Sequence, residues 1–235
     1  FYPPTHPLHG QDSIEVKQMT AKEEDLLTSR TLLKKGVALE RVLQNLIVNQ
    51  QIQAQSLLVG DRNAITIAIR SSAYGNMYET QITCPACGTS QEYSFDLNEM
   101  NIYEGEDRDA FGVTDNQDGT FSVQLPKTEV EVTFRLLVGR DEQAMLTQNT
   151  RKTNKATSTL VTSQLSSIVV AVNGDTSPQA IRYLVENIPS MDSRHLRAAY
   201  KLAAPNVDMT QHFACGECEH EADLEVPLTA DFFWP

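Results

Sequence analysis

The feature that most restricts the fold of this chain is its cysteines, which occur as two Cys-x-x-Cys pairs far apart in the sequence. The first pair, Cys84 and Cys87, lies in "CPACG", and the second, Cys215 and Cys218, lies in "CGEC". They are the only cysteines in the chain of 235 residues. Because 127 residues intervene between Cys87 and Cys215, a fold that uses all four must bring distant segments together.

Each pair has the sequence of a zinc knuckle, a tight turn that directs two thiolates and several backbone N–H groups at one cation. Two knuckles complete a tetrahedral site of four sulfurs with no open position. Binding releases thiol protons, and its free energy, on the order of 10 kcal/mol, becomes folding free energy. We therefore predict a structural Zn²⁺ ion with four sulfur ligands. The predicted ligands are Cys84, Cys87, Cys215 and Cys218.

Other uses of the four cysteines remain open at this point. They permit three disulfide pairings, which a reducing cytosol disfavours. A thioredoxin-type redox pair does not normally occur twice with glycine turns, and four free thiols are a further alternative. Compact zinc ribbons separate their pairs by about 15 to 20 residues, so this site would instead clip a very long loop, whose closure cost rises only logarithmically with length. His212 and His220 lie near the second pair, but we interpret them as exposed strand-edge histidines.

Alternating polar and apolar residues flank both knuckles and predict short antiparallel strands. The flanking segments are "GNMYETQIT" and "SQEYSFDL" around the first knuckle, and "VDMTQHFA" and "HEADLEVPL" around the second. We expect each knuckle at the tip of a hairpin, with zinc stapling the two hairpins into a zinc-ribbon-like module of residues 76–98 and 206–228.

The net charge of −12 and the pI of about 4.8 argue against a nucleic-acid partner, since binding to phosphates depends on a basic face. No apolar run reaches the roughly 18 to 20 residues of a membrane span, and no signal-peptide pattern is visible. We therefore expect a protein that folds in the cytosol, with no membrane span.

Residues 20–75 are expected to form a helical region. Thr20 and Glu23 make a capping box for a helix that runs to Lys35. An amphipathic helix follows in "VALERVLQNLIVN", and another is expected from near Asp61 to Tyr74, although that segment also has strand character. Before them, residues 1–19 carry three prolines and show no periodicity, which predicts either disorder or an extended arm that docks on a partner.

Residues 99–205, between the knuckles, read as an inserted α+β module. The predicted elements are a hairpin of residues 120–125 and 128–138, a polar stretch capped by Asp141, a buried strand ending at Asn173-Gly174, a helix with Pro178 near its start, and a helix initiated around Asp192 or Ser193. The polar stretch is compatible with a helix, a frayed helix or a mobile loop. With the helical region and the hairpins, the predicted class is α+β.

We find no sequence pattern of an enzyme. Asp192, Arg194, His195 and Arg197 cluster, but an acidic residue with basic residues one turn later is the ordinary start of a helix. No activated nucleophile, glycine-rich phosphate loop or open metal site accompanies them. The chain ends in an aromatic tail, residues 229–235, whose "FFWP" is expected either to fold back into the core or to dock on a partner.

The order of several motifs resembles the T4-type phage baseplate protein family. These motifs are "MTAKEEDLLTSRTLLKKG", "LLVGDRNAITIAIRSSAYG", "CPACG", "IRYLVENIPSMDSRHLRAAYK", "CGEC" and the closing "FFWP". The resemblance runs from about Met19 to the C-terminus and leaves residues 1–18 outside.

The resemblance implies a structural or assembly subunit of the central baseplate hub of a contractile tail, without catalysis. Its partners would be other baseplate or tail proteins, such as hub, tube or spike subunits, and its location would be the virion tail after assembly in the host cytoplasm. Two rivals remain. A zinc-ribbon regulator that binds nucleic acid would need basic residues around the knuckles, where "CGECEHEAD" is acidic. A metal-dependent hydrolase or redox enzyme would need an open zinc position or a reactive thiolate.

Overall fold

The elements of the fold mix helices and strands along the chain, which confirms the α+β class. The computed structural model describes residues 2–4, 6–34, 37–103, 107–152, 160–226 and 230–233. Its α-helices are α1 (Ala21–Thr28), α2 (Arg30–Lys34), α3 (Ala38–Leu46), α4 (Val59–Tyr74), α5 (Gly139–Lys152), α6 (Leu160–Ile168), α7 (Pro178–Asn187) and α8 (Ser190–Ala203). Its strands are β1 (Met77–Thr83), β2 (Ser90–Asp96), β3 (Asn101–Tyr103), β4 (Thr114–Asp115), β5 (Thr120–Gln124), β6 (Glu131–Arg135), β7 (Val169–Val172), β8 (Asn206–Asp208), β9 (Thr210–Ala214) and β10 (Glu221–Glu225).

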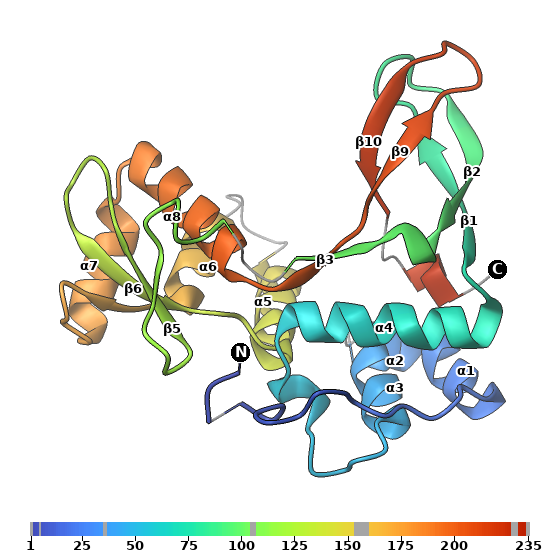
Figure 1. Ribbon diagram of the computed structural model, residues 1–235, viewed down its shortest axis with the longest axis horizontal. Helices are drawn as coiled ribbons and strands as arrows, with labels where there is room; N and C mark the ends of the chain where they lie inside the picture. Colours follow the sequence, from blue (N-terminus) through green and yellow to red (C-terminus); the bar gives the residue numbers. More distant parts are fainter. Residues whose placement is uncertain are drawn as a thin grey trace.

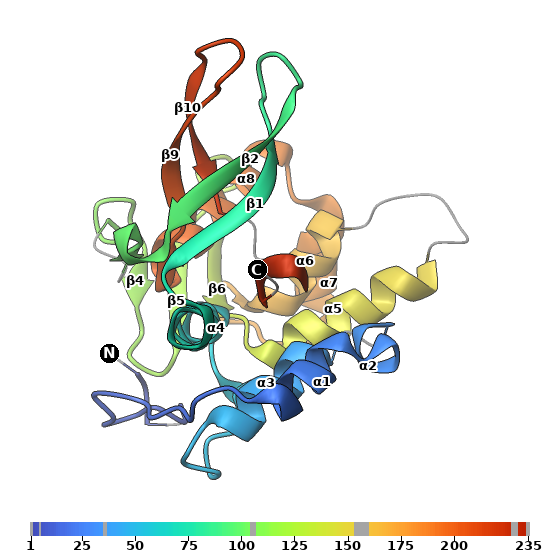
Figure 2. The same cartoon turned by 90° about the vertical axis from the view of Figure 1, so that its right-hand side faces the viewer.

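Three groups of elements are visible in the ribbon (Figure 1). Helices α1 to α4 form a base, two hairpins project from it, and a sheet with α6, α7 and α8 lies to the other side. The view at a right angle shows the same hairpins standing side by side above α4 (Figure 2). Among the described residues, no helix is both long enough and apolar enough to cross a bilayer.

The helical base begins as the sequence predicts but is more broken. Thr20 and Glu23 form the expected capping box, with the backbone N–H of Thr20 donating to Glu23 Oε2 over 3.1 Å. The predicted helix to Lys35 is interrupted at Ser29, whose extended backbone separates α1 from α2. The predicted end at Lys35 and Gly36 lies outside the described residues. On α3, the apolar stripe is buried as expected, with Val42, Leu43 and Leu46 facing the core.

Three helices begin before the aspartate that was predicted to cap them. Asp61, Asp141 and Asp192, which the sequence analysis placed at or near the helix caps, each occupy the third residue of α4, α5 and α8. The Asp61 and Asp141 carboxylates accept the backbone N–H three residues earlier, from Leu58 over 3.2 Å and Val138 over 3.0 Å. Acidic residues suit both positions, because the N-cap and the third residue both face unpaired N–H groups at the positive end of the helix dipole.

The N-terminal segment lies along its own chain, which differs from both expectations for it. Leu8 is buried in the core of the base, and the backbone N–H of Lys17 donates to Leu46 O over 2.8 Å. Near the start, the hydroxyl of Tyr2 donates to the carboxylate of Asp61, and the ring of His6 stacks on Tyr2 with centroids 4.2 Å apart. Burial lowers the pKa of His6 to about 4. The segment is therefore packed against α3 and the start of α4 in this structure.

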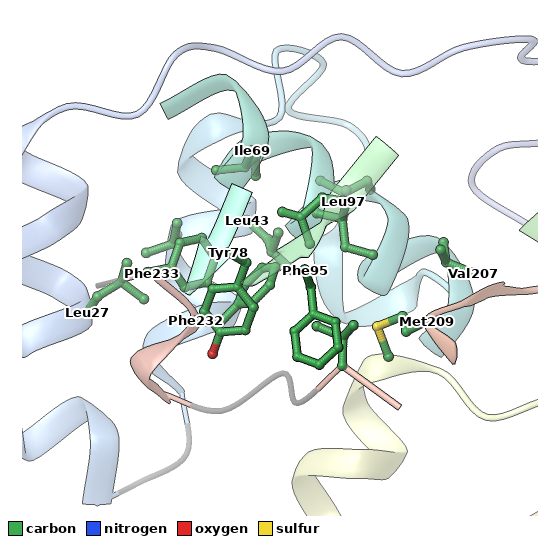
Figure 3. Close-up of a cluster of buried hydrophobic side chains, with 14 of the residues drawn as sticks. Leu27, Leu43, Ile69, Tyr78, Phe95, Leu97, Val207, Met209, Phe232 and Phe233 are labelled. Atoms are coloured by element: carbon green, nitrogen blue, oxygen red, sulfur yellow. The ribbon is translucent and has the colours of Figure 1, made fainter. Parts of the chain in front are cut away.

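The first hydrophobic core connects the helices to the hairpins. Figure 3 shows Tyr78 and Phe95 of the first hairpin packed with Phe232 and Phe233 of the C-terminal segment. Phe232 and Phe233 are buried in the 3₁₀ helix η3 (Ala230–Phe233), so the described part of the aromatic tail folds back into the core. Trp234 lies outside the described residues.

A buried arginine joins this tail to α4 and the first hairpin. Arg70 is 1% exposed, and its guanidinium donates to the carbonyl oxygens of Phe232 (2.8 Å), Gly75 (2.9 Å) and Met77 (3.3 Å). It also lies 5.1 Å from the centroid of the Tyr74 ring. Desolvation lowers the pKa of Arg70. One side chain thus fixes the end of α4, the start of β1 and the C-terminal segment.

The second core lies between a sheet and the helices that follow it. The sheet has the order β4-β5-β6-β7 and is antiparallel throughout. Alternate residues of β5 and β6 face inward, as the sequence pattern predicts, and pack against α6, α7 and α8. The predicted polar stretch after Asp141 forms α5 and α6, and residues 153–159 between them are outside the described part of the chain.

The two hydrophobic cores are joined where β3 and β8 pair and where α4 contacts the segment between the knuckles. Strand β3 pairs with β8, so the two ends of the segment between the knuckles lie side by side. At the start of α4, a Cβ atom on Gly60 would come within 2.0 Å of the carbonyl oxygen of Pro205. Arg62, on the same helix, forms ion pairs with Glu142 (2.7 Å) and Glu40 (3.3 Å). These contacts hold the second core directly against α4.

The Asp192 carboxylate joins α8 to the turn between β5 and β6, and we predict that its contribution to stability depends on pH. Its buried carboxylate accepts the N–H groups of Lys127 (2.9 Å) and Thr128 (3.0 Å) and the Thr128 hydroxyl (2.8 Å). Burial raises the pKa of Asp192, but these hydrogen bonds prevail and lower it below the ordinary value of an aspartate. The stabilisation is therefore present at neutral pH and is lost as the pH falls through the lowered pKa.

We expect Asp192→Asn to lower the free energy of unfolding by about 2 kcal/mol at pH 7, because it removes charge-assisted hydrogen bonds that a buried carboxylate accepts. The difference from the wild type should shrink as the pH is lowered below 4, measured by urea denaturation over a pH series. Asp12→Asn, at an exposed carboxylate, is the matched control and should have little effect. An Asp192→Asn defect that does not change with pH would contradict this account.

Arg70→Met should lower the free energy of unfolding by about 3 kcal/mol, because it removes a buried charged donor from three backbone carbonyls, of which that of Phe232 belongs to a buried residue. Hydrogen exchange should increase in the C-terminal segment and at the start of β1 before the rest of the base opens. The exposed Arg41 on α3 provides the control substitution Arg41→Met. Equal effects of the two substitutions would argue against this role for Arg70.

Candidate metal centre

Two antiparallel hairpins carry the cysteines. Strand β1 pairs with β2 from Met77↔Asp96 to Thr83↔Ser90, and β9 pairs with β10 from Thr210↔Glu225 to Ala214↔Glu221. Each Cys-x-x-Cys segment forms the turn at the end of its hairpin, as predicted, and the two tips lie at the far end of the projection (Figure 1). Apolar side chains on the facing surfaces hold the hairpins together, with the Tyr93 ring 5.0 Å from that of Phe213.

The two turns have the same backbone hydrogen bonds. In the first, Gly88 N–H donates to Cys84 O and Cys84 N–H donates to Thr89 O, both over 2.9 Å. In the second, Glu219 N–H donates to Cys215 O over 3.1 Å, and Cys215 N–H donates to His220 O over 2.9 Å. The residue after the second cysteine has positive φ in both turns, 74° at Gly88 and 55° at Glu219. Glutamate is strained in this conformation, so the second turn keeps the knuckle geometry without the glycine that favours it.

The four sulfur atoms lie together, although the sequence separates the pairs. Cys84 Sγ is 3.8 Å from Cys218 Sγ, and Cys87 Sγ is 3.8 Å from Cys215 Sγ. All four lie within 4.8 Å of one another. A tetrahedral ion with Zn–S bonds of about 2.3 Å requires sulfur–sulfur separations of ~3.8 Å. The thiol cluster is therefore compatible with a metal site, and its spacing fits tetrahedral sulfur coordination.

The charges of the thiols also favour a cation. The hydroxyl and then the backbone N–H of Thr89 lower the pKa of Cys87 to about 6. At Cys218, the backbone N–H of His220 lowers the pKa, but desolvation and the three neighbouring sulfurs raise it to about 12. One thiolate in the cluster thus disfavours the next, because like charges at this distance repel. A bound cation would remove that repulsion and allow all four sulfurs to ionise.

The cluster is anchored on one side and open on the other. Cys84 and Cys215 are buried at the end of the first core, whereas Cys87 and Cys218 are exposed. Gln91 on β2 links the hairpins, because its Oε1 accepts the N–H of Gly216 over 3.1 Å and lies 3.4 Å from Cys215 Sγ. Gln91 could not be predicted from the sequence, since a glutamine on a strand carries no pattern of its own.

The surroundings of the cluster are acidic. Residues 77–96 and 210–225 contain eight Asp or Glu and no Lys or Arg. His212 lies on the exposed strand surface, with its Nδ1 atom 3.9 Å from Asp223 Oδ1. The group of potential ligands found among the described residues consists of the four cysteines, without His212 or His220.

The other cluster considered in the sequence, around Asp192, is used for packing. Asp192 binds the turn at Lys127 and Thr128, as described above, and the His195 ring stacks on Phe111 with centroids 4.5 Å apart. Arg194 and Arg197 are exposed. The carboxylate is therefore already occupied by backbone donors.

Comparison with known families gives one match of nearly full length. A family model described as "T4 bacteriophage base plate protein" matches residues 4–234. Because the match begins at residue 4, the expectation that the resemblance excludes residues 1–18 is wrong for most of that segment. No curated protein and no solved structure gives a significant match.

Metal removal is predicted to unfold the hairpin tips first. We expect chelation to lower the melting temperature strongly, because a structural zinc site contributes on the order of 10 kcal/mol, comparable with the whole stability of a typical domain. Cys84→Ser should reproduce this loss, whereas Ala86→Ser, at an exposed position of the same turn, should not. Calorimetry with and without chelator, together with elemental analysis, measures both effects. A melting temperature that chelation leaves unchanged would contradict the structural role of the site.

Proposed function

Because the chain belongs to the T4 bacteriophage base plate protein family, we propose that it is a structural or assembly subunit of the central hub of a contractile tail baseplate. The observation that carries this proposal is the family match over residues 4–234. The family supports a location in the virion tail and association with other baseplate proteins. Hub, tube or spike subunits are the proposed neighbours, and assembly is proposed to take place in the host cytoplasm.

We propose that the four clustered cysteines hold a structural Zn²⁺ ion in a zinc-ribbon-like module. The spacing of the sulfurs, the matching backbone of the two turns and the repulsion among thiolates all support this assignment. With four sulfur ligands, the site has no open position for a substrate. Its role would be to make a rigid projection from two hairpins that are only two-stranded, since an isolated hairpin is at best marginally stable.

The proposed division of the chain follows its two cores. The described residues of the N-terminal segment (1–19), the helical region (20–75) and the tail (229–235) contribute side chains to the first core. The zinc-ribbon-like module takes residues 76–98 and 206–228, and the inserted module takes residues 99–205. Pairing of β3 with β8 supports this division, because it brings the two ends of the insertion together.

No catalysis is proposed for this chain. A closed sulfur site supplies neither a metal-bound water nor a vacant position, and the Asp192 carboxylate is bound by the turn at Lys127 and Thr128. A metal-dependent hydrolase would lose activity on chelation, and a redox enzyme would show rapid thiol labelling with zinc present. Either result would favour those alternatives.

The alternative of a zinc-ribbon regulator that binds nucleic acid has little electrostatic support. The hairpins carry eight carboxylates and no lysine or arginine in residues 77–96 and 210–225. These charges would repel phosphates at the surface with which a zinc ribbon would bind nucleic acid. Tight, salt-sensitive binding in a mobility-shift assay would revive this alternative.

Complementation tests the proposed role in the particle. A phage that lacks this chain should form complete tails when the wild type or Ala86→Ser is supplied, and should fail with Cys84→Ser. Electron microscopy and mass spectrometry of purified tails would measure assembly and the copy number of the chain. Normal tails with Cys84→Ser would refute the structural role of zinc. Normal tails without the chain at all would refute the baseplate role.

A further inference from the structure

The arrangement of the four thiols defines pairs that the sequence does not. Each close pair joins the two hairpins, Cys84 with Cys218 and Cys87 with Cys215, at 3.8 Å between sulfurs. We propose that peroxide oxidation converts the cluster into two disulfides with this cross-hairpin pairing, so that oxidation links the two hairpins covalently at their tips. The proposal extends the function proposed above, since it takes the same thiols to be metal ligands in the reduced protein.

The sequence alone leaves three disulfide pairings open. A Cys-x-x-Cys segment of thioredoxin type closes a disulfide within itself. Here all four sulfurs lie within 4.8 Å of one another, and the first cysteine of each turn lies 3.8 Å from the second cysteine of the other turn. A disulfide needs a sulfur–sulfur distance of about 2.0 Å, so each pair must approach by less than 2 Å. Backbone hydrogen bonds fix each turn, and the bond from Gly216 N–H to Gln91 Oε1 joins the two hairpins while the side chains rotate.

Each pair also combines one accessible and one protected sulfur. Cys218 is exposed and its partner Cys84 is 1% exposed, while Cys87 is exposed and its partner Cys215 is 3% exposed. Susceptibility to oxidation increases with the exposure of the sulfur to the oxidant. The exposed cysteine of each pair is therefore the one that reacts with the oxidant, and the buried cysteine is the one that resolves the product.

The chemistry balances with hydrogen peroxide as the oxidant. The exposed thiol attacks one peroxide oxygen, the O–O bond breaks, and the products are a sulfenic acid and water. The buried thiol then attacks the sulfenic sulfur, and a second water leaves as the S–S bond forms. Each pair loses two electrons to one peroxide, so the complete cluster consumes two. Disulfide sulfurs no longer act as thiolate ligands, and oxidation and metal binding therefore exclude each other.

A cross-hairpin pairing has a consequence that pairing within each turn lacks. Disulfides between the hairpins keep β1–β2 and β9–β10 joined after the metal has left, because they close loops of more than a hundred residues and so restrict the unfolded chain strongly. Disulfides within each turn would close loops of only a few residues and leave the hairpins free to separate. The oxidised tip should therefore stay assembled without metal.

The test is peptide mapping of the full-length wild-type protein. The reduced protein, first analysed for metal content, is treated with two equivalents of hydrogen peroxide, its remaining thiols are blocked, and disulfide-linked peptides are identified by mass spectrometry. We expect loss of all four free thiols, release of the metal, and the links Cys84–Cys218 and Cys87–Cys215. Links of Cys84 to Cys87 and of Cys215 to Cys218 would overturn the proposal.

Two matched variants and one thermal measurement test the disulfide pairing independently of the peptide map. In Cys218→Ser, Cys84 should remain a free thiol while Cys87–Cys215 forms; in Cys215→Ser, Cys87 should remain free while Cys84–Cys218 forms. A Cys84–Cys87 link in the first variant would overturn the proposal. In the oxidised wild type, chelator should no longer shift the melting temperature, and a shift as large as in the reduced protein would also overturn it.

The outcomes separate this proposal from the metal site. A protein that contains no metal when isolated, yet forms the cross-hairpin links, would refute the zinc site and support the pairing. A protein that contains one zinc ion but forms links within each turn would retain the zinc site and refute the pairing.

Discussion

The convergence of four sulfur atoms, from segments 128 positions apart in the chain, is the constraint on which the rest of the structure depends. Cys84 and Cys215 lie at one end of the first hydrophobic core, and the helices of the base lie at the other. The core and the sulfur cluster therefore form one continuous structure. Because the ends of the intervening segment also pair, as β3 with β8, the whole second core is attached to this structure without being part of it.

Helix α4 organises the base because both ends of the chain meet it. Near its start, Asp61 accepts the Tyr2 hydroxyl, and Gly60 lies against the Pro205 carbonyl. Near its end, Arg70 binds the carbonyls of the C-terminal segment and of the first hairpin. A helix fixed in this way at both ends transmits the position of the hairpins to the second core.

Features that depend on neighbouring residues were predictable, and features that depend on distant ones were not. The capping box at Thr20, the apolar stripe of α3 and the strands around each knuckle are local patterns, and all are present. The starts of α4, α5 and α8 were misplaced because aspartate suits both the N-cap and the third residue of a helix. The partners decide between the two: Leu58 for Asp61, and the turn at Lys127 and Thr128 for Asp192. The burial of Arg70 could not be predicted, because an isolated arginine in a helix normally faces solvent.

The sequence by itself determined which residues can form the thiol cluster, the acidic character of its surroundings and the family to which the chain belongs. Cysteine spacing, charge and motif order are properties of the chain alone. The tertiary structure decided which sulfur lies beside which, because pairing across hairpins depends on the packing of Tyr93 against Phe213 and not on the Cys-x-x-Cys spacing. It also decided that the N-terminal segment and the described part of the aromatic tail pack on the base, since only the folded core offers the apolar surface that buries Leu8 and Phe232.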